Sequence, residues 1–190
     1  MKKGLLAVGF LVFTIFILLL GCAGEPTQQL TDAKDALENA RQAEADLYAP
    51  DLFSQAENTI AEAENLIGQK KYAEAKKLLM DAKLAADQAA SQAAINKDNT
   101  KTEVEDYLAA INGAMGQLKE TQDLAKQWKI PAKQWELTEE KAAWDENQKN
   151  AQAEYNAGNY YSAKKLAAQI HREITGTDSQ LRELVMSKQK

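Results

Sequence analysis

Apolar residues recur along most of this chain at the three- and four-residue spacing that places them on one face of a helix. The most regular series consists of Tyr72, Ala75, Leu79, Ala82, Ala86, Ala89 and Ala93. This is a heptad seam lined mostly by alanine. Small seam residues let helices approach closely, although each buries little apolar area. The pattern predicts long helices packed along thin cores.

Breaks in the pattern divide the chain into six predicted helices and a tail. The apolar series span residues 30–47, 52–67, 72–93, 104–128, 137–155 and 160–174, followed by a tail helix that begins near Thr177. Pro50 is expected in the first turn of the second helix, the one place where a helix tolerates proline. Gly68, Gly158 and Gly176 are expected to end helices. Nothing in the series is typical of a strand.

Residues 96–100 form the most polar stretch of the interior. Thr102 and Glu105 have the spacing of a capping box, which would begin a new helix. We therefore expect a break or kink within residues 96–101. The alternative is one long helix from about residue 71 to residue 128.

The two halves of the chain share a pattern of helix, proline, helix, tyrosine and helix. Residues 72–78 align with residues 160–166 at an offset of 88. Between the proline and the tyrosine the second half has seven more residues, which predicts a helix two turns longer. A diverged duplication of a three-helix unit accounts for this pattern, and coincidence between alanine-rich helices is the alternative.

The predicted fold is therefore all-α, an elongated antiparallel helical bundle resembling a coiled coil and built from two duplicated three-helix units. The first unit is placed at residues 30–98 and the second at residues 99–176. A short C-terminal helix is placed at residues 177–190.

The N-terminus has the layout of a secretory signal peptide, with a basic start and an apolar run at residues 4–20. The run closes with Leu19-Leu20-Gly21-Cys22, which resembles the lipobox of bacterial lipoproteins. The resemblance implies cleavage of residues 1–21 and attachment of lipid to Cys22, leaving residues 22–29 as a tether. Two alternatives are an unmodified thiol and an uncleaved anchor, although residues 4–20 would span only about 26 Å at ~1.5 Å per residue.

The residue after the cysteine is Ala23 rather than aspartate. In lipoproteins of enteric-type bacteria, aspartate at this position commonly means retention at the inner membrane. The resemblance therefore implies an outer-membrane anchor facing the periplasm, with the inner membrane as the alternative.

Charge and cysteine content exclude several classes of function. The chain has 23 basic and 28 acidic side chains, and loss of residues 1–21 would change the net charge from −5 to −7. An acidic chain is a poor ligand for nucleic acid. Cys22 is the only cysteine, so neither an intramolecular disulfide nor a CxxC motif is possible.

No residue pattern indicates catalysis, a metal site or a cofactor other than lipid on Cys22. His171 is the only histidine and has no nucleophile at a suitable spacing. We therefore expect a structural role for it and do not expect an enzyme. Among the aromatic residues, Trp135 lies off the apolar stripe and is the best candidate for an exposed contact with a ligand or partner.

The first half resembles the alanine-rich domain of unknown function 4398, found in bacterial envelope lipoproteins. The resemblance covers about residues 27–95 and rests on Ala40-Arg41, Tyr48-Ala49-Pro50, Ala56, Ala63, Tyr72, Ala75, Leu79, Ala82 and Ala86. Lys70 stands where such sequences often have glycine, and Gly158 restores glycine in the second copy. The family implies a location and a fold but no mechanism.

These observations predict a non-enzymatic, lipid-anchored scaffold that docks other envelope proteins or associates with itself. The alternative is a lipoprotein that binds peptidoglycan or another cell-wall glycan through an aromatic patch near Trp135.

Overall fold

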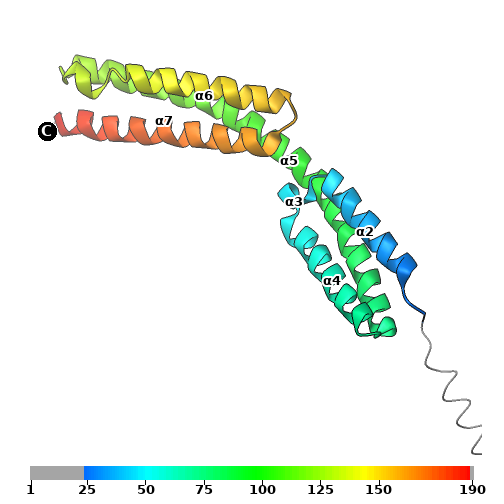
Figure 1. Cartoon of the computed structure of the whole chain (residues 1–190). Helices are drawn as coiled ribbons and strands as arrows, with labels where there is room; N and C mark the ends of the chain where they lie inside the picture. The colour runs from blue at the N-terminus through cyan, green and yellow to red at the C-terminus, as the bar shows by residue number, and fades with distance from the viewer. Residues whose placement is uncertain (1–23, 189–190) are drawn as a thin grey trace, which may run out of the picture. The chain divides into compact units, whose positions relative to one another are not determined.

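The computed structural model describes residues 24–188, and the secondary structure within this range is entirely helical (Figure 1). The elements are α2 (Thr27–Gln42), α3 (Ala45–Tyr48), α4 (Pro50–Gly68), α5 (Tyr72–Gln127), the 3₁₀ helix η1 (Ala132–Gln134), α6 (Thr138–Asn156) and α7 (Tyr160–Lys188). The predicted all-α fold is confirmed.

The chain forms two compact units, with the boundary between Ser91 and Gln92. Helix α5 crosses this boundary and contributes a segment to each unit. The first unit comprises α2, α3, α4 and the beginning of α5. The second comprises the remainder of α5, η1, α6 and α7.

The first unit has a core of small side chains. Two buried clusters join α2, α4 and α5, one made of Ala33, Ile60, Ala63, Leu79 and Ala82 and the other of Ala36, Ala56, Ala85 and Ala86. Every member of the predicted alanine seam from Ala75 to Ala93 is buried. Because alanine adds little side-chain volume, this core depends on close approach of the helices.

The second unit buries larger side chains. Its cluster consists of Ile111, Ala114, Leu118, Ala125, Ile130, Trp144, Ala151, Ala167, Ile170, Ile174, Leu181 and Val185. Trp144, which lies within the predicted apolar series of residues 137–155, is 5% exposed. Trp128 would close the predicted apolar series of residues 104–128, but it lies beyond the end of α5 and is 43% exposed.

The expected break at residues 96–101 is wrong, because α5 runs without interruption from Tyr72 to Gln127. The buried series continues through the polar stretch from Ala93 to Thr100 and Val104. The Thr100 hydroxyl donates to the Asn96 carbonyl at 2.7 Å, so its burial leaves no unsatisfied group. Thr102 bonds backward to the Asp98 carbonyl, and no capping box forms.

Two other predicted helix ends differ from the structure. Gly176 lies inside α7, where Ile174 and Asp178 continue the buried face past it. In the first predicted helix a break appears instead, because Glu44 adopts a left-handed conformation with φ of 58° between α2 and α3. That turn allows Tyr48 to be buried.

The two copies share the same helical turn. Lys70 and Gly158, at the offset of 88, both adopt left-handed φ angles of 61° and 83°. The amides of the turn at Gln69, Lys70 and Lys71 bond to carbonyls four, three and five residues earlier, and those at residues 157–159 repeat this pattern. This is a Schellman motif at both helix ends, which a diverged duplication predicts.

The seven additional residues of the second copy do not lengthen its helix. Helices α4 and α6 both contain 19 residues and begin and end at the same offset of 88. The extra residues instead form the connection at residues 131–137, which contains η1 and ends at Leu137 with φ of 49°. The prediction of a longer helix is therefore wrong.

Candidate functional site

The predicted lipidation site, Cys22, lies outside the described residues, as do residues 1–21. Among the residues that the structure describes, no helix is long and apolar enough to cross a membrane.

Trp135 lies at the end of η1, in the connection between α5 and α6. Its ring is partly buried against the core of the second unit. The indole Nε1 donates to the Ile130 carbonyl at 2.9 Å, and the Gln122 amide donates to the Trp135 carbonyl. Lys141 Nζ in turn donates to Gln122 Oε1 at 2.6 Å. These bonds fix the connection and leave only part of the Trp135 ring for contact with a ligand.

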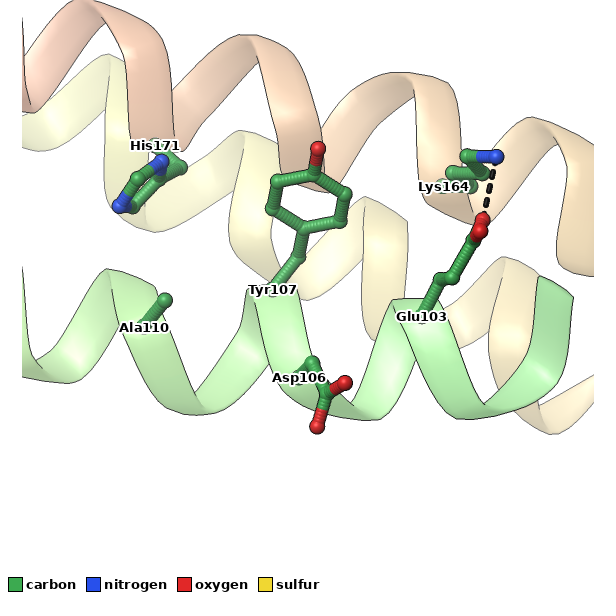
Figure 2. A pocket seen from close by; sticks show the side chains of 6 residues that line it. All are labelled: Glu103, Asp106, Tyr107, Ala110, Lys164 and His171. Atoms are coloured by element: carbon green, nitrogen blue, oxygen red, sulfur yellow. Dashed lines mark ion pairs between the residues drawn. The ribbon is translucent and has the colours of Figure 1, made fainter. Parts of the chain in front are cut away.

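A groove of about 380 Å³ lies between α5 and α7 in the second unit. Figure 2 shows Tyr107 rising from α5 toward α7, between His171 on one side and the ion pair of Lys164 with Glu103 on the other. The rings of Tyr107 and His171 lie 6.0 Å apart at an angle of 57°. Asp106 points away from α7 in this view.

His171 therefore packs beside an aromatic ring on the groove wall. Within residues 24–188, no group of three or more ligating side chains could hold a metal ion. No local sequence pattern indicates this groove, because Glu103 and Lys164 are distant along the chain and meet only when α5 and α7 pack together. The surface it presents combines an aromatic ring with charges of both signs, which suits a polar partner segment.

A second groove, of about 430 Å³, lies between α6 and α7. The buried Trp144 is one of its lining residues, and its Nε1 donates to Glu173 Oε2 at 3.0 Å. Gly176 lines the groove and has open space where a Cβ would lie. Arg172 lines it as well. Because Trp144 is buried, its ring offers little surface to a ligand in this groove.

A buried polar contact joins α5 and α7. Asp178 is 7% exposed, and its Oδ1 accepts a hydrogen bond from the Thr121 hydroxyl at 2.5 Å. Arg182 Nε donates to the other oxygen at 2.6 Å. Both carboxylate oxygens are therefore satisfied, as burial of a charge requires. The predicted apolar series of α7 gave no indication of a buried aspartate.

Tyr155 connects α6 to α5 through its hydroxyl, which donates to the Glu105 carboxylate. This hydrogen bond is the main cause that raises the pKa of Tyr155 to about 12, because ionised tyrosine could not donate it. The Tyr160 ring lies 5.4 Å from the Tyr155 ring. This ring contact joins the last turn of α6 to the first turn of α7.

The most exposed apolar side chains of the first unit lie on α5. Met80 is 61% exposed and Leu84 is 58% exposed. They are one helical turn apart and therefore adjacent on the surface. The heptad seam of α5 gives no indication of these two residues, because they lie on the opposite face of the helix.

Comparison with known proteins provides no relative for this chain: no family model, curated protein or solved structure matches it.

Proposed function

We propose that this chain is a non-enzymatic lipoprotein of a bacterial cell envelope, anchored by lipid on Cys22 and facing the periplasm from the outer membrane. The observation that carries the proposal is Leu19-Leu20-Gly21-Cys22 at the end of the apolar run. The preceding residues have the layout of a secretory signal peptide, and the motif resembles the lipobox of bacterial lipoproteins, in which the cysteine carries the lipid.

The proposed molecular role is docking of protein segments on helical faces. Two features of the described residues support it. The second unit has surface grooves along α7, and the first unit has exposed apolar side chains on α5. Adjacent exposed apolar residues are common at protein interfaces, as are aromatic side chains such as Tyr107, which lines the groove between α5 and α7. We also propose membership of the family of domain 4398, on the residues given above.

Metabolic labelling with a clickable palmitate analogue tests the anchor. The wild-type chain should acquire label and fractionate with the outer membrane, whereas Cys22→Ala should not be labelled. Because Cys22 is the only cysteine, loss of label in this variant assigns the site without ambiguity. An unlabelled wild-type chain that retains residues 1–21 would refute lipidation and indicate an uncleaved anchor.

A cell-wall glycan is the second candidate ligand, and the observation that favours it is the exposure of Trp128. This ring and the partly buried Trp135 both lie in the segment that follows α5. Sedimentation with purified peptidoglycan tests binding. Trp128→Ala should reduce retention more than Trp135→Ala, because more of the Trp128 ring is exposed. Absence of wild-type retention would refute this candidate.

A further inference from the structure

We propose that two copies of this chain associate through the exposed face of α5 in the first unit, with the two α5 helices antiparallel. The inference rests on the proposed docking function and identifies the partner as a second copy. The face consists of Ala73, Lys77, Met80, Leu84, Asp87 and Ser91, hereafter the α5 outer face.

These six residues lie within an arc of about 80° at ~100° per residue. All are exposed, and the buried seam that includes Leu79, Ala82 and Ala86 occupies the opposite side of the helix. The α5 outer face is therefore accessible along its length in the first unit.

The α5 outer face is symmetric in spacing about the level of Ala82. Met80 and Leu84 are each about 3 Å from that level along the axis, at ~1.5 Å per residue. Lys77 and Asp87 are each about 7.5 Å from it, and the small residues Ala73 and Ser91 are farther out at equal distances. The apolar pair is thus central, with opposite charges at equal distances on either side.

This arrangement is self-complementary only when the second helix is reversed. In an antiparallel pair related by a two-fold axis, Met80 of one copy meets Leu84 of the other, and Lys77 meets Asp87 at both ends. A parallel pair would place Lys77 against Lys77 and Asp87 against Asp87, which is repulsive. The charge pattern therefore selects both the partner and the orientation.

Asp87 already accepts a bond from Lys83 at 2.6 Å within the same helix. Its side chain is 52% exposed, and a carboxylate has two oxygens that can each accept from more than one donor. A second ammonium group from the partner's helix can therefore join this pair without displacing Lys83.

The apolar pair of Met80 and Leu84 can be compared with the equivalent residues of the second copy. At the offset of 88, the residues that correspond to Met80 and Leu84 are Ala168 and Arg172 of α7. The second copy thus forms the same helix and the same turn without an exposed apolar pair. Met80 and Leu84 are therefore not requirements of the repeat, which is consistent with a role in association.

A pair of this size is expected to be weak in solution, because four central side chains bury far less than a standard interface. An N-terminal lipid would confine all copies to one membrane surface. Confinement raises the effective concentration and allows a weak contact to form.

Sedimentation velocity of the full chain in detergent, over a range of protein concentrations, tests the association. The wild-type chain should show a reversible dimer. Substitution of the apolar pair by its counterparts from the second copy, Met80→Ala with Leu84→Arg, should weaken the dimer at least tenfold. Leu47→Gln is the matched control, since Leu47 is exposed in the same unit but lies on α3; it should leave the dimer unchanged.

Charge reversal identifies the partner. Lys77→Glu and Asp87→Lys should each weaken the dimer, and the double variant should restore it to within about twofold of wild type, because both partners then carry the reversed pair. Restoration requires that the partner be a second copy. The inference would be overturned by a wild-type chain that stays monomeric at all concentrations. It would also be overturned by a double variant that dimerises as weakly as the single variants. Either result would hold if the α5 outer face bound a different protein.

The dimerisation test and the test of the lipid anchor can fail independently. Palmitate labelling without dimer formation would refute only the α5 contact. A dimer with the stated variant pattern in an unlabelled chain would refute only the anchor.

Discussion

Exchange of glycine between the two equivalent turns tests how much the turn chemistry contributes to stability. Lys70 and Gly158 occupy the same place in the two Schellman motifs, with φ of 61° and 83°. A left-handed conformation costs a residue with a Cβ about 1–2 kcal/mol. Gly158 incurs no such cost, whereas Lys70 does.

The expected changes have opposite signs. Lys70→Gly relieves the backbone strain but gives the unfolded chain more freedom and removes a cation from a helix C-terminus, so the net gain is about 0.5 kcal/mol. Gly158→Lys should cost about 1 kcal/mol. No heavy atom lies within 4 Å of a Cβ built on Gly158, so this cost is conformational and involves no clash.

Denaturant unfolding followed by two signals is the assay. All three tryptophans lie in the second unit, so their fluorescence reports on that unit, whereas circular dichroism reports on the helices of both. Gly158→Lys should lower the fluorescence midpoint. Lys70→Gly should raise the midpoint of the circular dichroism transition. Gln69→Gly is the control, because Gln69 has an ordinary φ of −83° and gains nothing from glycine. Destabilisation by Lys70→Gly equal to that by Gln69→Gly would refute the reasoning.

Three further predictions concern the second unit. Gly176→Ala should stabilise it by about 0.5–1 kcal/mol, because glycine is unfavourable inside a helix and the added methyl group meets open space; chemical unfolding measures the gain. Thr121→Val should cost about 1–3 kcal/mol by removing a partner of the buried Asp178 carboxylate, as judged by the fluorescence midpoint. Tyr155 should titrate near pH 12, as followed by the ultraviolet absorbance of the phenolate. Because the folded state raises the pKa and so favours the protonated form, the contribution of Tyr155 to stability should be complete below pH 10. That contribution should be lost as the pH rises from 10 to 12.

Each of these predictions has a matched control. Gly113→Ala tests the same effect on α5, where a Cβ also meets open space. Thr100→Val removes a bond only to its own helix and should cost less than Thr121→Val. Glu105→Gln should lower the apparent pKa of Tyr155, because the hydrogen bond to the Glu105 carboxylate is the main cause of the raised pKa. Equal costs for the two threonine variants, or an unchanged pKa in Glu105→Gln, would contradict the corresponding argument.

The helical spacing of apolar residues predicted the class of fold and most of the buried seam, because burial on one face of a helix produces that spacing directly. It failed where local polarity conflicted with continuity of the seam. At residues 96–101 the polar side chains suggested a break, yet Ala93, Thr100 and Val104 keep the buried face in register and the helix continues. Tertiary burial outweighed local propensity there.

The candidate sites were less predictable, for a related reason. The contacts that define the groove between α5 and α7, such as Lys164 with Glu103, join residues that no local pattern connects. The position of Trp135 off the apolar stripe predicts an exposed ring, but its place in an irregular connection allows its Nε1 to bond to the Ile130 carbonyl. Periodicity indicates which residues face a core and does not indicate how a connection folds back on it.

The two copies share a backbone pattern but differ in the size of their core side chains. Both copies retain the same turn hydrogen bonds and a helix of the same length before it. At equivalent buried positions, however, Ala56, Ala82 and Ala86 of the first copy correspond to Trp144, Ile170 and Ile174 of the second. Turn chemistry determines where each helix begins and ends, and the period of the seam determines which side of the helix is buried. These core substitutions change neither the turn chemistry nor the seam period. Core volume fixes how closely the helices approach, so it could diverge while the backbone pattern remained.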